Sequence, residues 1–332
     1  MAKRRRLTKK QRERRRNVIL GFLVVLVIFF GGYLFGRRDV TFDTVKTKLD
    51  EATTRIEKHI DNIALPDSTV RTAPVNTSQI HLFDVGQGSS ILLISQDGTS
   101  VLVDTGRFDD GAKRIISYLD TTLGLEAPLD LLIFTHNDAD HIGHGDLVLE
   151  YFDVQEVWMN GVDHTTQVYD NVLDAILVSD AAYAEPKAGE VHQRGPFTIE
   201  IFNPKKDSAS QDHNDESIVT RITFDGLSVM TSGDASVTEE AKIIERNGSL
   251  TADILVVGHH GAADATSDSW IQAVQPKLAF YQAGVDNPYR HPSPEVIERL
   301  AAYDIPVYGT DELGTISLYI GENGDVTVET EY

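Results

Sequence analysis

Hydrophobic and polar positions divide the chain into a first part with long apolar stretches and a second part with short ones. Residues 17–36 carry no charge and form one apolar run, close to the ~20 residues that cross a hydrocarbon core of ~30 Å. Residues 41–64 place apolar side chains at spacings of three and four, namely Val45, Leu49, Ala52, Ile56, Ile60 and Ile63. That spacing predicts a helix with one apolar stripe.

From residue 78 onward, short apolar runs alternate with helical patterns. The runs expected to be strands are 80–85, 90–95, 100–104, 129–135, 197–202, 218–224, 227–231, 254–257 and 278–281. The expected helices are 113–123, 236–246, 268–274 and 294–303. This mixture predicts an α/β domain in which helices cover sheets. We therefore expect a basic tail (1–16), an anchor (17–36), a helical stalk with a linker (37–77) and one main domain (78–332).

Charge is distributed unevenly along the chain. Residues 1–38 hold twelve of the 30 Lys and Arg residues and one of the 51 acidic residues, so the remainder has 18 basic and 50 acidic residues, a balance of −32. Ten of the basic residues precede the apolar run, and the positive-inside rule then puts the N-terminus in the cytoplasm and the main domain outside it. So acidic a domain does not attract long polyanions through its overall field.

Alternatives remain for the first part of the chain. The apolar run could be a buried core helix or a cleaved signal peptide, although its end lacks an Ala-x-Ala cleavage pattern. The stalk could pack on the main domain or dimerise as a short coiled coil. The chain contains no cysteine, which excludes disulfides, zinc–thiolate sites and cysteine nucleophiles.

The densest chemical signal follows the expected strand 129–135. Four residues able to bind a metal stand within six positions, namely His136, Asp138, Asp140 and His141. If the chain stays extended, alternation points His136, Asp138 and Asp140 to a common side. Imidazoles suit a borderline metal and carboxylates a harder one, so we expect a divalent-metal site here.

Two later segments extend this expectation. Asp234 follows the expected strand 227–231 and precedes an expected helix, so it could cap that helix or bridge two ions. His259 and His260 follow the expected strand 254–257 and are flanked by glycines. A histidine pair at a strand end is a plausible source of one further ligand.

The residues in these segments resemble the metallo-β-lactamase superfamily, whose signature is His-x-His-x-Asp-His. The branch that contains the extracytoplasmic domain of the ComEC DNA-uptake proteins has Asp at the second position, as Asp138 is here. Further segments that match this branch, in order, are 83–88, 103–106, 214–219, 233–234, 259–261, 287–292 and 310–314. The resemblance covers roughly residues 78–320 and implies an αββα sandwich with the metal site along one sheet edge.

The resemblance also implies roles for single residues. His136 and Asp138 would hold one divalent ion (Zn²⁺ or Mn²⁺), and Asp140 and His141 the other. Asp234 would bridge the two ions, and His259 would complete the second ligand set. Residues expected to support the ligands from behind are Asp84, Asp104, Asn214, Ser217, Asn287 and Tyr289. Three residues would act on the substrate: Asp140, His260 and His291.

Some positions depart from the family pattern. The wider superfamily often has another histidine ligand before the bridging aspartate, and His213 falls in that interval without a motif around it. His144 stands where the branch has a second glycine. His291 could donate a proton, contact phosphate or serve only a structural role in its loop. Neither His213 nor His144 is assigned to the site.

The basic tail and the apolar run predict a membrane anchor, and the resemblance implies a hydrolase that uses two metal ions to activate a water molecule. The nearest branch favours phosphodiesters, with nucleic acid or a nucleotide as substrate, while the acidic surface disfavours long polyanions. The alternatives are hydrolysis of a small ester, amide or phosphoester, and a non-catalytic surface binding module on the same fold. β-Lactam cleavage is disfavoured because Asp138 does not match the resistance enzymes.

Overall fold

The computed structural model describes residues 77–125, 127–206, 212–321 and 326–332. The expected tail, anchor and stalk lie outside the described residues, except for Thr77. None of the helices in the described ranges is long and apolar enough to cross a membrane.

The first half of the described chain forms most of an eight-stranded mixed sheet with the order β17-β16-β1-β2-β3-β5-β7-β8. In that order the strands are Val326–Thr330, Ile316–Gly321, Thr77–Leu82, Ile91–Ile94, Ser100–Val103, Leu131–Ile133, Glu156–Trp158 and Ala182–Ala184. β3, β5, β7 and β8 run parallel to one another. A small separate ladder pairs β4 (Pro128–Leu129) with β6 (Asp153–Val154).

The second half forms a seven-stranded sheet with the order β15-β14-β13-β12-β11-β10-β9. In that order the strands are Val307–Gly309, Leu278–Tyr281, Ile254–Val256, Leu227–Thr231, Val219–Phe224, Phe197–Asn203 and Val191–Arg194. β12 to β15 are parallel, so their carboxyl ends meet at one edge, where α/β proteins place their ligands.

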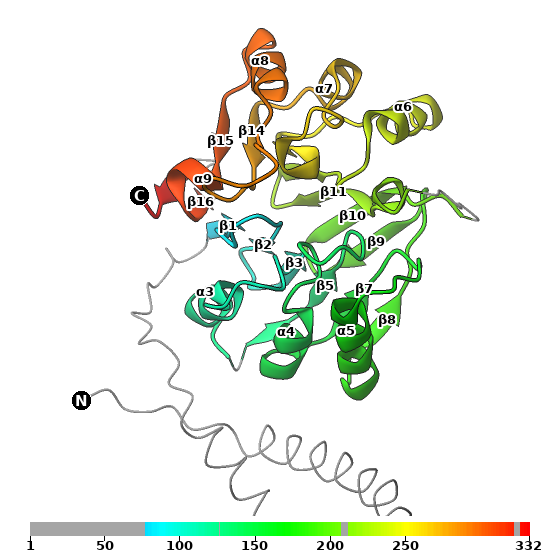
Figure 1. Cartoon of the computed structure of the whole chain (residues 1–332), viewed down its shortest axis with the longest axis vertical. Coiled ribbons are helices and arrows are strands. Elements are labelled where there is room, and N and C mark those ends of the chain that lie inside the picture. The colour runs from blue at the N-terminus through cyan, green and yellow to red at the C-terminus, as the bar shows by residue number, and fades with distance from the viewer. Residues whose placement is uncertain (1–76, 126, 207–211, 322–325) are drawn as a thin grey trace, which may run out of the picture. The chain divides into compact units, whose positions relative to one another are not determined.

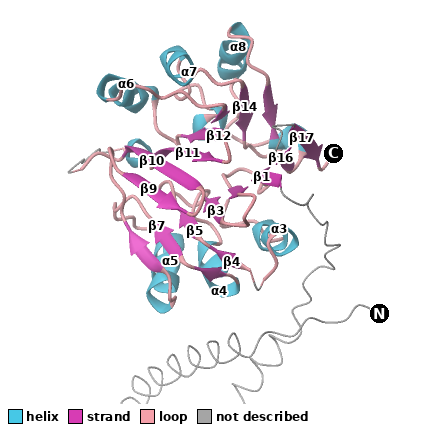
Figure 2. Ribbon diagram, turned by 180° about the vertical axis from the view of Figure 1, so that it is seen from behind, coloured by secondary structure: helices cyan, strands magenta, loops and turns pink. Residues whose placement is uncertain are grey.

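Helices cover the outer face of each sheet (Figures 1 and 2). The first sheet carries α3 (Arg114–Thr122), α4 (Gly145–Tyr151) and α5 (Gln167–Val178), and the second carries α6 (Val237–Arg246), α7 (Asp268–Val274) and α8 (Pro294–Ala302). Three shorter helical turns are α9 (Thr310–Leu313), η1 (Asn214–Glu216) and η2 (Gly258–Gly261). The predicted αββα sandwich is confirmed.

Local sequence explains where several helices begin. The hydroxyl groups of Thr166, Ser236 and Ser267 each accept a hydrogen bond from a backbone N–H in the first turn of α5, α6 and α7. α8 begins with Ser293 as cap and Pro294 at its first position, where a missing N–H costs nothing. Such caps stabilise a helix by ~1 kcal/mol each.

Apolar side chains fill the space between the two sheets. Leu93, Val101 and Ile133 enter it from the first sheet, and Phe197 and Val229 from the second; all are fully or almost fully buried. Removing a buried side chain as large as Phe197 would cost ~3–5 kcal/mol. This layer fixes the two sheets against each other and thereby the loops at their shared edge.

Most expected elements are present with ends shifted by a few residues, and 227–231, 268–274 and 278–281 match without shift. The single strand expected over 129–135 is wrong. The chain leaves β4 at Asp130, whose carboxylate accepts hydrogen bonds from Ser100 N (2.8 Å) and Ser100 Oγ (3.3 Å), and then enters β5. The sequence patterns also missed α4, α5, α9, β6 to β9, β15 to β17 and the short turns η1 and η2.

Candidate metal centre

The candidate ligands come from loops that follow parallel strands at one edge of the sandwich. The loop after β5 carries His136 to His141, the turn after β12 carries Asp234, and the turn after β13 carries His259 and His260. Three stretches far apart in the sequence therefore meet at one place, as the resemblance implies.

The loop after β5 does not stay extended. The backbone bends at Thr135 and His136, and Asp138 O accepts from His141 N at 3.0 Å. The alternation of an extended strand therefore does not explain how the side chains of His136, Asp138 and Asp140 are placed. The bend instead brings the buried rings of His136 and His141 together, with centroids 4.1 Å apart.

Asp104 and Thr135 hold this histidine pair from behind. Asp104 Oδ2 lies 2.7 Å from His141 Nδ1 and accepts from Thr135 Oγ1 at 2.8 Å. Thr135 Oγ1 also lies 3.2 Å from His136 Nδ1. A carboxylate on the rear nitrogen of an imidazole fixes its tautomer and leaves Nε2 to face a metal. Asp104 thus lies where the resemblance expects it.

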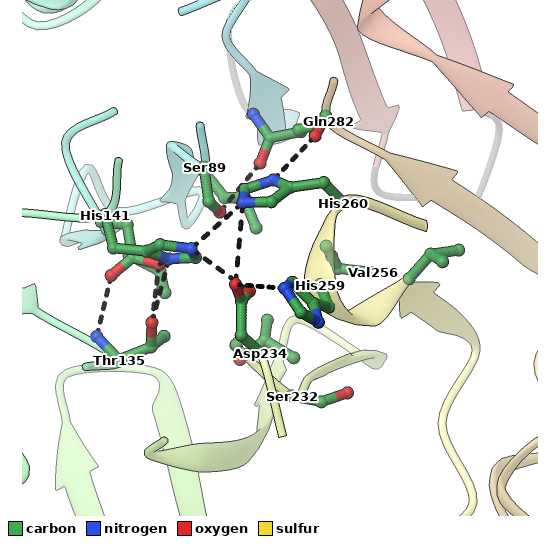
Figure 3. Close-up of a pocket in the computed structure, with 15 residues that line it drawn as sticks. Ser89, Thr135, His141, Ser232, Asp234, Val256, His259, His260 and Gln282 are labelled. Atoms are coloured by element: carbon green, nitrogen blue, oxygen red, sulfur yellow. Dashed lines mark hydrogen bonds and ion pairs between the residues drawn. The ribbon is translucent and has the colours of Figure 1, made fainter. Parts of the chain in front are cut away.

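Asp234 lies close to four imidazoles, and Figure 3 shows three of them, those of His141, His259 and His260. Its Oδ1 is 3.2 Å from His141 Nε2, and its Oδ2 is 3.9 Å from His136, 3.8 Å from His260 and 3.6 Å from His259, each at Nε2. The Asp234 N–H donates to Ser217 Oγ at 3.1 Å, so Ser217 fixes the turn that presents this carboxylate.

Gly233, immediately before Asp234, is required by both conformation and space. Its φ is +51°, and a Cβ there would stand 2.8 Å from Ser217 Oγ and 3.0 Å from Thr135 Cβ. Glycine therefore lets the Asp234 turn approach the two residues that support the ligands.

His259 and His260 differ in burial and in partners. His260 is buried; its Nδ1 lies 2.9 Å from the carbonyl oxygen of Gln282, and its Nε2 lies 3.4 Å from Asp140 Oδ2 and 3.3 Å from His141 Nε2. The carbonyl can only accept, so Nδ1 donates and Nε2 faces the cluster. The side chain of His259 is 25% exposed, and its Nδ1 lies 3.1 Å from Asp264 on the outside.

This arrangement fits divalent metal ions. Two groups of three side chains bring their ligand atoms within 4.8 Å of one another: His136, His141 and Asp234, and Asp140, His141 and His260. His136 Nε2 is buried without a hydrogen-bond partner, which is costly unless a ligand or metal satisfies it. Imidazole and carboxylate together are the donors of zinc and manganese sites.

Charges within the cluster depend on one another. Burial alone would raise the pKa of Asp234, but His141, His260 and His136 outweigh it and hold that pKa well below its usual range. Burial would lower the pKa of His141, yet Asp234 and Asp104 raise it well above its ordinary value. For His136, burial prevails and lowers the pKa to about 3. The buried carboxylate is thus ionised and needs positive charge around it.

Asp138 and Asp140 lie at the outer rim of the cluster, with side chains 39% and 35% exposed. Asp138 Oδ2 is 3.9 Å from His136 Nε2, and its Oδ1 is 3.4 Å from His164 Nε2.

The sequence patterns missed His164, which lies between β7 and α5 without a motif around it. They also missed Gln282, since it acts on His260 through a backbone carbonyl that no residue type reveals.

Other expected site residues lie elsewhere. The expectation that Asp84 orients a ligand imidazole is not met among the described residues, because its carboxylate pairs with Arg114 at 2.7 Å and accepts from Gly86 N. Asn214 accepts from Ser217 N through its carbonyl. His144 Nε2 lies 3.0 Å from the Asp110 carbonyl.

His213 is exposed and faces the ring of His164 edge-on, with centroids 5.2 Å apart. Neither His213 nor His144 belongs to the two ligand groups formed by the described residues.

The loop after β14 brings His291 to the rim. Asn287 holds this loop, because its Oδ1 accepts from His291 N at 3.0 Å and its Nδ2 donates to the carbonyls of Gly284 and His291. The His291 ring stacks between Tyr289 and His260, with centroids 5.7 and 6.4 Å away. His291 Nδ1 is buried without a hydrogen-bond partner.

Comparison with known proteins agrees with this geometry. Residues 83–284 match the model of the metallo-beta-lactamase superfamily. ComE operon protein 3 of Bacillus subtilis is 32% identical over 255 residues, which are 72% of this chain and 32% of that protein. Competence protein ComA of Neisseria gonorrhoeae is 27% identical over 255 residues, 76% of this chain and 33% of that protein. The chain thus spans about a third of the length of these curated relatives.

A solved structure of the CmlA beta-hydroxylase has a TM-score of 0.52 at 15% identity and covers 85% of this chain and 60% of that one. That likeness shows the fold alone. The family model covers more than half of the chain, and the resemblance drawn from the motifs, including that to the ComEC branch, is confirmed. The chain belongs to the metallo-β-lactamase superfamily.

Proposed function

We propose that this protein is a membrane-anchored, extracytoplasmic phosphodiesterase that acts on nucleic acid or nucleotides with two divalent ions, Zn²⁺ or Mn²⁺. The main support for a two-metal centre is the position of the Asp234 carboxylate, which lies within 3.2–3.9 Å of four imidazole Nε2 atoms. Imidazoles lie near both oxygens of this carboxylate. Asp234 is therefore placed to share two ions with them, as a bridging ligand does.

In this proposal His136 and Asp138 would hold one ion, Asp140, His141 and His260 would hold the other, and Asp234 would be a ligand to both. His260 takes the place that the family resemblance gave to His259, since its tautomer is fixed by Gln282 O. Two ions bound there would lower the pKa of a water molecule toward neutrality and stabilise negative charge in the transition state.

The side chains at the rim handle the protons. The Asp140 carboxylate, whose side chain is about one-third exposed, accepts the proton of the attacking water. His291 donates a proton to the leaving oxygen, as general acids do.

The substrate class rests on two observations. One relative that matches the domain is named a competence protein, and Asp138 makes the ligand set richer in carboxylates than the His-x-His signature. The negative balance of the chain after residue 38 limits attraction of long duplexes, so short or single-stranded substrates are favoured.

The anchor is proposed from residues 1–38 alone. Ten basic residues before the uncharged run 17–36 orient the domain outward under the positive-inside rule. External protease added to intact cells should digest the domain and spare the first residues. Protection of the domain in sealed cells would overturn the orientation.

The test of the reaction uses the full chain in detergent, stripped with a chelator and reloaded with Mn²⁺ or Zn²⁺. We expect metal-dependent cleavage of short oligonucleotides, and Asp140→Asn should abolish most of it. Asp253→Asn is the matched control, since Asp253 pairs with Lys277 and Ser228 just before β13, at the opposite strand end from the cluster. A metal-loaded protein that opens an ester, amide or lactam and no phosphodiester would refute the proposal.

A further inference from the structure

Three rings form a stack that runs from the solvent to the candidate metal centre. The outermost, Tyr289, is 65% exposed. Its ring lies 5.7 Å from that of His291 at an interplanar angle of 27°, and His291 lies 6.4 Å from His260 at 20°. His260 is the buried end of this stack, beside Asp234 in Figure 3.

The stack has a fixed base. Asn287 makes hydrogen bonds with both the N–H and the carbonyl of His291. Ser293 N donates to Gly261 O at 2.8 Å, which ties the loop to the turn that carries His260. A Cβ on Gly261 would stand 2.8 Å from Pro292 Cβ, so the two segments are in close contact. The loop that carries the exposed Tyr289 ring is therefore held by hydrogen bonds at Asn287 and at Ser293.

A positively charged side chain, that of Arg107, lies in the loop after β3, next to the loop that carries Asp140. Thr105 N donates to His141 O at 2.7 Å and Phe108 N donates to Ala139 O at 2.9 Å. Arg107, between them, is thereby held against the loop that carries Asp140. Its guanidinium, with a side chain 35% exposed, is oriented by Asp109. The loop that carries Tyr289 approaches the same segment, because Gly284 N donates to Gln87 Oε1 at 3.1 Å and a Cβ on the adjacent Gly88 would stand 3.0 Å from Arg107 N. The hydrogen bond with Asp109 raises the pKa of Arg107, with smaller contributions from Asp140 and Tyr289.

We propose that Tyr289 and Arg107 form a subsite for one nucleotide beside the scissile phosphate, with the base stacked on Tyr289 and a phosphate paired with Arg107. The inference rests on the proposed phosphodiesterase function and names its substrate as single-stranded or frayed nucleic acid. A base within a duplex offers no free face to an aromatic side chain, whereas an unpaired base does.

The test is fluorescence anisotropy of the full chain with labelled single-stranded hexamers in chelator, so that binding is measured without cleavage. A hexamer with bases is compared with an abasic hexamer of equal charge. Tyr289→Ala should weaken binding of the first about tenfold, the loss typical of one stacked base, and leave the abasic hexamer unchanged. Tyr289→Phe should retain affinity. Tyr183→Ala removes another exposed tyrosine, on β8, and should change neither.

Arg107→Gln should weaken both hexamers equally and reduce the slope of log affinity against log salt by about 0.7, as for one lost phosphate contact with a single strand. Equal binding of both hexamers by the wild type, or a Tyr289→Ala protein indistinguishable from Tyr183→Ala, would overturn the subsite. Discrimination between the hexamers without cleavage in Mn²⁺ or Zn²⁺ would keep the subsite and refute the phosphodiesterase.

Discussion

The loop after β5 and the turn after β13 both carry more than one histidine, but they present them differently. In the loop after β5, His136 and His141 are both buried and their rings lie 4.1 Å apart. In the turn after β13, His260 is buried whereas His259 is partly exposed and reaches Asp264.

The backbone explains the difference. His259 and His260 both have left-handed conformations, with φ of 51° and 57°, so strand alternation cannot say which ring faces inward. In the loop after β5, the rear contacts of Thr135 and Asp104 hold both rings in place. Supporting contacts, rather than sequence spacing, decide which members of a dense motif enter the site.

The largest loss of metal binding is expected from substitution of Asp234, which faces both the loop after β5 and the turn after β13. Asp234→Ala should reduce the metal content from two ions to fewer than one per chain, because each ion would lose the shared carboxylate. Turnover should fall by more than the ~10–100-fold expected of an outer supporting residue. Metal analysis after gel filtration measures this, with Asp253→Ala as the control. Two ions retained at unchanged affinity would make Asp234 only a turn residue.

Within the turn after β13, His260→Ala should weaken binding of the second ion by at least about tenfold, and His259→Ala should do so much less. The reason is that His260 Nδ1 is committed to Gln282 O and its Nε2 faces Asp140 and Asp234. Isothermal titration with Mn²⁺ or Zn²⁺ compares the two variants directly. A larger loss of metal affinity in His259→Ala than in His260→Ala would show that His259 is the ligand.

In the loop after β5, Asp104→Asn should lower metal affinity about 10–100-fold, because an amide cannot hold His141 Nδ1–H as a charged acceptor does. Asp84→Asn is the matched control: it follows β1 in the same Asp-x-Gly setting but pairs with Arg114. We expect Asp84→Asn to leave metal affinity unchanged in the same titration. Equal losses from both variants would mean that the contact with His141 is not what matters.

The smallest effect is expected at the rim of that loop. His164→Ala should weaken binding of the first ion only a few-fold, since its 3.4 Å contact with the partly exposed Asp138 is a surface-type ion pair. His192→Ala, which removes a comparable contact with Glu190, is the control. A loss as large as that of His136→Ala would make His164 a ligand.

Sequence patterns predicted the strands, helices and ligand-bearing loop that a short stretch of sequence is enough to identify. Apolar runs and helical patterns located β10 to β14 of the second sheet and α6 to α8, and ligand density located the loop after β5. Short strands such as β7 and β8, with three residues each, have too little pattern to stand out. The difference between Asp84 and Asp104 was also invisible, because both precede a glycine by two positions. Only the parallel pairing of β3 with β5 places Asp104 behind His141.

Anomalous diffraction from crystals of the full chain loaded with Mn²⁺ would show directly whether Asp234 binds both ions. We expect two metal peaks about 3.5–4 Å apart, both in contact with the carboxylate of Asp234, with His136 on one and His260 on the other. A single peak, or two peaks of which only one contacts Asp234, would contradict it.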